Sequence, residues 1–248
     1  MRLKNTFLIL LKLAVIVGLI VYLPSKVSTS PNAQVINAIN NTTSSTPVAA
    51  NPQTTEFTIT KDKKVHIYNT HQSEEYDGYN VVLGANYLKD CLNSQGYQCD
   101  VEGNDFESYK AVHNIAYNKS YTVSKMYLEQ SLQSNGGYDL IIDFHRDSIS
   151  KDLSTISYNG KSYAKIMFVV GKSSGKFDAV NQLSQKLSDL ANATIPKISR
   201  GVYVKNSHYN QGTSDNMVLI EVGAQSNTKE EIQATVEIIA KAIGEYLG

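Results

Sequence analysis

The sequence predicts an α/β fold, a mostly parallel or mixed β-sheet flanked by helices and preceded by one N-terminal transmembrane helix. Short apolar runs, such as YDLIIDF at 138–144, are typical of buried strands. Amphipathic segments with a helical period alternate with these runs, which favours helices packed on the faces of a sheet. The apolar run at 7–23 is long enough to predict the membrane helix.

The N-terminal run, FLILLKLAVIVGLIVYL, carries a single charge, Lys12, whose long stem lets its ammonium group reach the membrane surface. Arg2 and Lys4 precede the run, so residues 1–6 are expected to stay in the cytoplasm and the rest of the chain to lie outside. The alternative is a cleaved signal peptide, but no clear A-x-A cleavage site follows. An uncleaved single-pass anchor in the cell membrane is the favoured interpretation.

Residues 24–56 are rich in Ser, Thr, Asn, Pro and Ala and contain four of the five prolines of the chain. Such a segment buries too little apolar surface to offset its ordering entropy. We therefore expect a flexible linker that holds a domain at 57–248 away from the membrane.

Six strands are expected in this domain, at 64–70, 98–103, 138–144, 163–171, 201–205 and 217–223. Four helices are expected: 79–96, 120–133, 177–193 and a last helix that follows Thr228. Gly96 suits the position just past the end of the first helix, where the backbone turns left-handed. Thr228 and Glu231 form a capping box, the signature of a helix start.

The net charge limits which partners are expected, and the cysteine content limits how disulfides could stabilise the domain. The chain has 23 basic and 23 acidic residues, so no bulk attraction to nucleic acid is expected. Cys91 and Cys99 are too few for a disulfide scaffold. Outside the cell they could form one bridge, which closes a short loop, or remain two free thiols, and the sequence leaves both alternatives open.

Three predicted strands are followed by groups that bind metals or move protons. His71 and Glu74 follow the first strand, His145 follows 138–144, and Glu221 follows MVLI. Ligands of open α/β sheets bind beyond the carboxyl ends of the strands, so these groups are expected to meet. Two imidazoles and one carboxylate are typical of catalytic zinc sites. We therefore predict His71, Glu74 and His145 as Zn²⁺ ligands and Glu221 as general acid and base.

Each residue alone also has an ordinary explanation. His71 could be a loop histidine, and His145 could accompany a salt bridge between Arg146 and Asp147. Glu221 is harder to explain, because an acid at the end of a buried strand is costly unless it is paired or binds a metal. Of the other histidines, His66 and His113 are expected to be structural or solvated. His208 is a reserve ligand.

Five segments closely resemble the stage II sporulation protein P family: IYNTHQSEEY, NKSYTVSK, DLIIDFHRDS, YAKIMFVVG and SRGVYVKNSHYNQGTSDNMVLIEVGAQSNT. The resemblance covers about residues 64–245. That family consists of membrane-anchored cell-wall hydrolases of spore-forming bacteria and is similar to zinc-dependent N-acetylmuramoyl-L-alanine amidases. The resemblance implies an amidase-like, phosphorylase/hydrolase-type fold and cleavage of septal peptidoglycan during engulfment. It also implies endopeptidase activity and a lytic transglycosylase partner of the stage II sporulation protein D type.

The resemblance places the family's His-x-x-Glu block on His71 and Glu74, its His-Arg-Asp block at His145, and its late acid on Glu221. Glu75 remains an alternative to Glu74 as the carboxylate ligand. Three further residues could hold carboxylate or amide groups of the substrate: Arg146, Arg200 and Asn210.

Two other functions remain open. A zinc carboxypeptidase or endopeptidase acting on the stem peptide would use the same order of residues, with Arg146 or Arg200 clamping a terminal carboxylate. A non-catalytic wall-binding module would keep the fold without the chemistry. Zinc retention separates catalyst from binder, and product mass separates the two catalysts.

Overall fold

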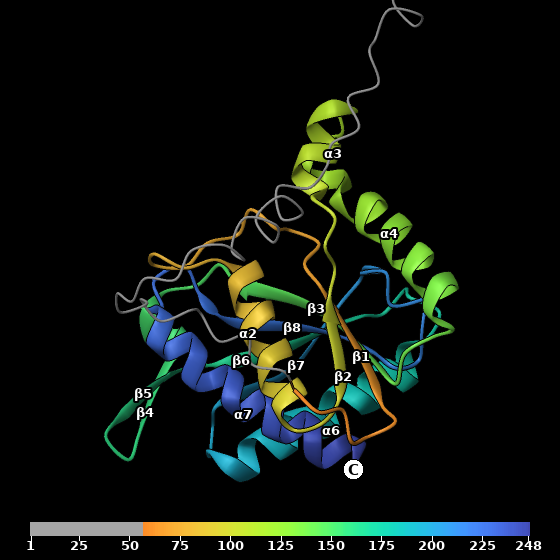
Figure 1. The fold of residues 1–248 in the computed structure, drawn as a ribbon. Coiled ribbons are helices and arrows are strands. Elements are labelled where there is room, and N and C mark those ends of the chain that lie inside the picture. The colour runs from red at the N-terminus through yellow and green to blue at the C-terminus, as the bar shows by residue number, and fades with distance from the viewer. Residues whose placement is uncertain (1–56) are drawn as a thin grey trace, which may run out of the picture. The chain divides into compact units, whose positions relative to one another are not determined.

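The apolar runs of the sequence become the strands of one sheet in the computed structural model, which describes residues 57–248 (Figure 1). The six strands are β1 (Lys64–Tyr68), β2 (Gln98–Val101), β3 (Leu140–Asp147), β6 (Ile166–Gly171), β7 (Ser199–Lys205) and β8 (Met217–Ala224). Their order in the sheet is β2-β1-β3-β8-β6-β7.

Most neighbouring strands run parallel. β1 pairs in this way with β2 and β3, β3 with β8, and β6 with β7. β6 and β8 are antiparallel, so the sheet is mixed, as predicted. The carboxyl ends of β1, β3 and β8 consequently share one edge of the sheet.

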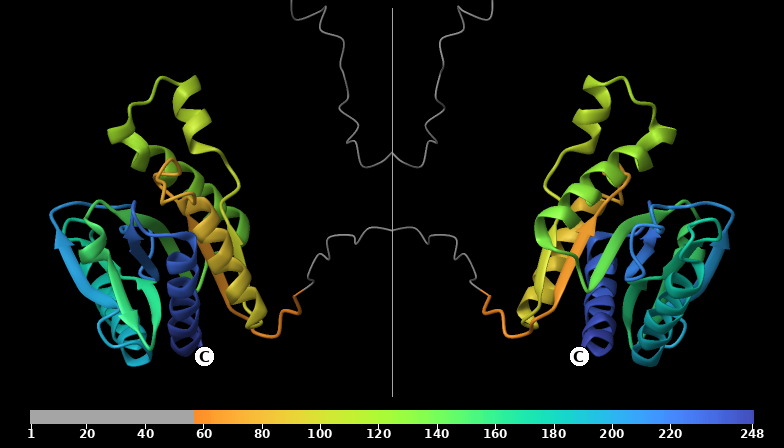
Figure 2. Two further views of the ribbon diagram at one scale, coloured as in Figure 1. Left: turned by 90° about the vertical axis from the view of Figure 1, so that its left-hand side faces the viewer. Right: turned by 90° about the vertical axis from the view of Figure 1, so that its right-hand side faces the viewer.

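The two faces of the sheet carry different helices because successive side chains of a strand point to opposite faces. Leu140, Ile142 and Phe144 of β3 belong to the larger core, with α2 (Val81–Ser94), α6 (Phe177–Thr194) and α7 (Lys229–Leu247). Ile141 belongs to a smaller core beneath α3 (Phe106–Val112) and α4 (Ser120–Asn135). α3 and the start of α4 extend beyond the sheet in both views of Figure 2.

The predicted helix boundaries have identifiable chemical causes. The side chain of Asn80 caps α2 by accepting a hydrogen bond from the Leu83 amide. Gly96 has a φ of +88°, and a Cβ there would lie 2.1 Å from Oγ1 of Thr60. The capping box of Thr228 and Glu231 is present at the start of α7, which confirms that prediction.

The predicted strand at 163–171 is wrong in one respect: it is two strands. β5 (Lys161–Ala164) pairs antiparallel with β4 (Thr155–Tyr158) in a separate hairpin, and β6 begins only at Ile166. Asn159 and Gly160 both have positive φ at the hairpin turn, which is the turn chemistry that an Asn-Gly pair favours. The short helices α3 and α5 (Lys151–Ser154) also escaped the prediction, since they are too short to show a clear apolar period.

Three expectations fall on residues 1–56: the cytoplasmic tip, the transmembrane helix at 7–23 and the linker at 24–56. All lie outside the described residues. Within 57–248, no helix is both long enough and apolar enough to cross a membrane.

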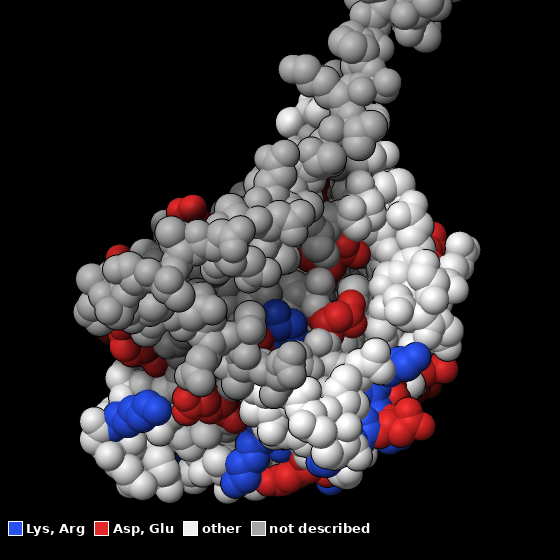
Figure 3. Space-filling view, viewed as in Figure 1, with Lys and Arg blue, Asp and Glu red and all other residues white. Residues whose placement is uncertain are grey.

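Two expectations about composition can be checked in the described domain. Cys91 and Cys99 are free thiols, so the structure shows the unbridged alternative. Acidic and basic side chains are interspersed over the part of the surface in Figure 3 that grey atoms do not cover, as the balanced charge suggests.

Candidate active site

His145 and Glu221 lie inside strands, so the expectation that each follows the end of its strand is wrong. β3 continues through His145 to Asp147, and β8 continues through Glu221 to Ala224. The two residues are direct partners in the parallel register of β3 and β8. Partners in register share a face of the sheet, and here it is the face of α4, because Ile141 and Met217 point there from the same strands.

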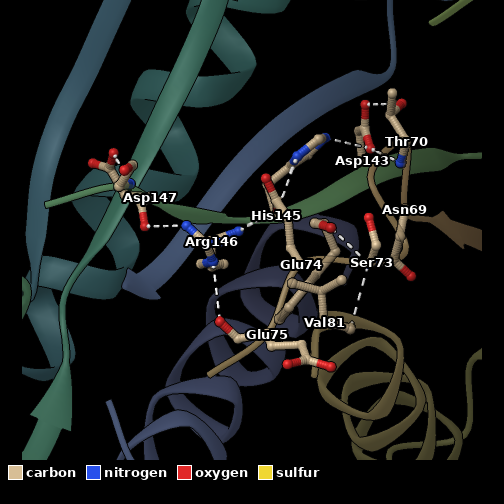
Figure 4. A network of polar contacts seen from close by, with 12 residues as sticks. Asn69, Thr70, Ser73, Glu74, Glu75, Val81, Asp143, His145, Arg146 and Asp147 are labelled. Atoms are coloured by element: carbon tan, nitrogen blue, oxygen red, sulfur yellow. Dashed lines mark hydrogen bonds and ion pairs between the residues drawn. The ribbon is translucent and has the colours of Figure 1, made fainter. Parts of the chain in front are cut away.

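His71 and Glu74 follow β1 and lie beside His145. The rings of His71 and His145 are 5.4 Å apart, and Oε2 of Glu74 is 3.4 Å from Nδ1 of His145. The same oxygen of Glu74 accepts a hydrogen bond from the Arg146 amide at 3.2 Å. The structure therefore brings together all four predicted catalytic and metal-binding residues. The neighbour that was the alternative ligand, Glu75, is instead held through its carbonyl by Nε of Arg146 at 3.1 Å (Figure 4).

Asp143 is a site residue that the sequence reasoning missed. It is fully buried, and its Oδ1 lies 2.8 Å from Nε2 of His145. The two oxygens of Asp143 also accept hydrogen bonds from the amide and the hydroxyl of Thr70, at 3.0 and 2.8 Å (Figure 4). The available signal was a carboxylate inside an apolar strand, two residues before His145 and hence on the same face.

Burial and mutual charge shift the proton affinities of these groups. Burial works against the charge of His145, but the carboxylates of Asp143 and Glu74 outweigh it and raise the pKa of His145 well above its usual value. Burial, reinforced by His145, lowers the pKa of His71. Burial raises the pKa of Glu221 from 4.5 to about 7, against the attraction of His145. Shifts of this kind concentrate where side chains handle protons.

Three buried polar atoms of this cluster have no hydrogen-bond partner among the described residues: Nδ1 of His71, Nε2 of His145 and Oε2 of Glu221. Nε2 of His145 is close to Asp143, but it is not aligned for a hydrogen bond. Buried polar atoms are rarely left unpaired. Imidazole nitrogens with carboxylate oxygens are the donor types of catalytic zinc, so the residues present fit such an ion. In the arrangement of residues 57–248, however, no three such side chains already converge as a metal-binding group.

Aromatic rings from the start of α4 and the turn before it enclose the cluster. Tyr117 stacks on His71, with ring centres 4.5 Å apart, and Tyr121 meets His71 edge-on at 5.7 Å. Tyr121 also contacts Tyr209, at 5.5 Å. These rings restrict the orientation of His71, and nothing in the spacing of the sequence indicated that they would do so.

The predicted substrate-binding residues have partners within the protein. Arg200 forms an ion pair with the carboxylate of Asp147, whereas Arg146 reaches Asp147 through its backbone carbonyl. The salt bridge considered for Arg146 is therefore formed by Arg200. The buried Asn210 donates to Oγ of Ser124 at 2.9 Å.

The remaining histidines lie as expected or apart from the cluster. Nδ1 of the buried His66 lies 2.9 Å from Asp100, which supports a structural role. His113 is exposed and stacks on Tyr109, and His208 lines a groove beside α4.

The model that describes the stage II sporulation protein P family matches residues 24–244. This chain belongs to that family. Stage II sporulation protein P of Bacillus subtilis (strain 168) is 34% identical over 207 residues, which cover 75% of this chain and 52% of the relative. The chain thus spans about half the length of the curated relative that it matches.

The solved structure of one amidase shares the fold. The CwlD amidase of Clostridioides difficile, solved in complex with the GerS lipoprotein, superposes with a TM-score of 0.50 at 15% identity, over 75% of this chain and 98% of that chain. Ami1 of Mycobacterium smegmatis, an N-acetylmuramyl-L-alanine amidase, gives a TM-score of 0.48 at 14% identity, over 77% and 99%. The first likeness confirms the expectation of a central sheet flanked by helices.

Proposed function

We propose that this chain is a zinc-dependent peptidoglycan hydrolase that cleaves the amide between N-acetylmuramic acid and the L-alanine of the stem peptide. The observation that carries the proposal is the pairing of His145 with Glu221 on adjacent strands, with His71 and Glu74 beside them. Nδ1 of His71 and Oε2 of Glu221 are also buried there without partners. Membership of the sporulation family supports a role in septal wall degradation during engulfment.

His71, His145 and Glu74 would hold the metal. A bound zinc ion would supply a water of lowered pKa and polarise the carbonyl of the scissile amide. Asp143 lies against Nε2 of His145, so it orients the ring and leaves Nδ1, the nitrogen that faces Glu74, as the ligand atom. Tyr117 holds the other imidazole by stacking on it.

Glu221 carries the proton in this proposal. Its pKa of about 7 lets the carboxylate take a proton from the attacking water and return it to the leaving amine of L-alanine. Its Oε2 is buried, which shields that oxygen from bulk water that would otherwise compete for the proton.

The alternative, a carboxypeptidase, has less support because it needs a free arginine to clamp a terminal carboxylate. Arg200 is paired with Asp147, and Arg146 is held by the carbonyls of Glu75 and Asp147. An endopeptidase needs no such clamp and remains the second candidate.

Mass spectrometry of purified peptidoglycan after treatment with the protein tests the proposal. An amidase releases intact stem peptides that begin with a free L-alanine amine and leaves the glycan bare, and chelation stops it until zinc is restored. Cuts inside the stem would indicate the endopeptidase instead. An unchanged wall would indicate the binding module.

Location and partners belong to the same proposal. A single-pass anchor at 7–23 would hold residues 57–248 on the outer face of the cell membrane, beside a lytic transglycosylase of the stage II sporulation protein D type. Protease added to intact cells should then cut within 24–56, and protection of that segment would contradict this orientation.

A further inference from the structure

A polar groove of about 380 Å³ lies between α4 and the loop that precedes β8. α4 contributes Lys125 and Glu129, and the loop contributes His208, Asn210 and Thr213. None of these residues takes part in the proton transfer proposed above.

The groove is connected to the candidate active site through hydrogen bonds. Asn210 donates to Oγ of Ser124 at 2.9 Å, and the hydroxyl of Thr70 lies 2.9 Å from the same oxygen. Thr70 immediately precedes His71. The loop also places Tyr209 against Tyr121, whose ring meets His71.

The loop is held in a strained conformation at the point of this connection. Tyr209 and Asn210 have φ values of +49° and +55°, in the left-handed region that side chains other than glycine rarely adopt. The buried Gln211 fixes them in place, because its amide donates to the carbonyl of Val169 at 2.8 Å and accepts from the amide of Gly171 at 2.7 Å. Strain of this kind persists where the surroundings enforce it, and it clusters at ligand-binding sites.

The charges of α4 follow a fixed order away from the active site. Tyr121, Lys125 and Glu129 are four residues apart, so they lie on one face of the helix, about 6 Å apart along its axis. The face therefore presents an aromatic ring, then a cation, then an anion. Lys125 and Glu129 pair at 3.7 Å with each side chain 53% exposed, a contact weak enough to be exchanged for charges of a ligand.

We propose that this groove binds the stem peptide on the far side of the scissile amide, an inference that rests on the proposed function. Stem peptides carry an acidic second residue and, in many walls, a third residue with a free amine. Lys125 would pair with the carboxylate and Glu129 with the ammonium group. An extended peptide spans about 3.3 Å per residue, so the roughly 12 Å from Tyr121 to Glu129 accommodates about three residues.

The test compares two soluble substrates, muramoyl-L-alanine and a muramoyl tripeptide with the acidic and diamino residues. The variant exchanges the two charges, Lys125→Glu with Glu129→Lys, and so keeps the net charge and the ion pair within the helix. Its kcat/KM for the tripeptide should fall about tenfold, because two attractions become repulsions, while that for muramoyl-L-alanine stays unchanged. The single variants Lys125→Gln and Glu129→Gln should each lower only the tripeptide value, about threefold.

Three results would overturn the inference. Equal loss on both substrates would show a general defect, and no loss on the tripeptide would show that the groove does not bind it. Both results leave the proposed function standing if the wild-type protein cleaves the substrates. Failure of the wild-type protein to cleave either substrate, with zinc supplied, would overturn the proposed function and the inference with it.

Discussion

Glu221 on β8 and Glu231 on α7 differ in nearly every contact. Glu231 accepts hydrogen bonds from Asn227, Thr228 and Ser162 at 2.9 to 3.0 Å, and Lys151 lies 3.2 Å away. Oε2 of Glu221 has no partner in the described domain.

Burial favours the protonated form of both acids, but their pKa values shift in opposite directions. At Glu231 burial disfavours the charge, but the hydrogen bonds outweigh it and lower the pKa. At Glu221 burial prevails and raises the pKa to about 7. A satisfied carboxylate stabilises the start of α7, whereas an unsatisfied one is left able to exchange a proton near neutrality. The difference separates an acid that holds the fold from one that is available for chemistry.

The largest expected effect is on activity, which should depend on Glu221 and not on Glu231. Glu221→Gln keeps the size of the side chain but cannot move a proton, so the rate of stem-peptide release should fall by about 10²–10⁴. Glu231→Gln is the matched control and should keep activity within about threefold, because it lies outside the reactive cluster. A near-normal rate of stem-peptide release by Glu221→Gln would show that Glu221 does not transfer the proton.

The second prediction concerns Gly223, which lies between the two acids. Its φ is +64°, and a Cβ there would lie 2.8 Å from Oδ1 of Asn227 and 2.9 Å from Ile232. Gly223→Ala should therefore lower the free energy of unfolding by about 4 kcal/mol, through backbone strain and overpacking. Denaturant unfolding measures this effect, and a loss below about 1 kcal/mol would mean that the network of Glu231 is not tightly packed.

The third prediction concerns stability at Glu221. The pKa rises from 4.5 to about 7 on folding, so wild-type stability declines as the pH rises through this window. In metal-free protein, Glu221→Gln should be more stable than the wild type by about 3 kcal/mol above pH 7, and the difference should vanish below pH 4.5. Denaturant unfolding at pH 4 and pH 8 measures the difference, and a destabilised variant at pH 8 would show that the carboxylate has a partner.

The fourth and smallest effect is a loss of stability, opposite in sign to the gain expected for Glu221→Gln. Glu231→Gln should lower the free energy of unfolding by about 1–2 kcal/mol at pH 7, since it weakens the capping box and the contact with Lys151. The folded pKa of Glu231 lies below 4.5, so its contribution is present above pH 4.5 and is lost as the pH falls through the folded pKa. Denaturant unfolding at several pH values measures this loss. The difference in unfolding free energy between variant and wild type should disappear at acidic pH.

The sequence predicted what depends on local patterns. Apolar runs predicted the strands of the sheet, and the capping box of Thr228 and Glu231 predicted the start of α7. The grouping of His71, Glu74, His145 and Glu221 also followed, because parallel strands carry the residues near their carboxyl ends to one edge of the sheet.

The features that were missed depend on contacts between distant segments. Asp143 looked like one polar residue in an apolar strand, and only the approach of Thr70 shows how its charge is accommodated. The packing of the loop at Tyr209 against α4 is fixed by the hydrogen bond between Asn210 and Ser124, which are distant in the sequence. The hydrophobic periodicity of the sequence therefore could not predict it. The Asn159–Gly160 turn was a local signal that was overlooked.

Zinc titration of the metal-free protein by calorimetry tests the central claim, that the unsatisfied cluster at β3 and β8 is a metal-dependent site. The wild type, Glu221→Gln and Glu231→Gln should each bind one zinc ion per chain with similar affinity. His71→Ala and His145→Ala should weaken binding by at least about 100-fold. Wild-type affinity in both histidine variants would contradict the account, because the two imidazoles would then not be ligands of the metal.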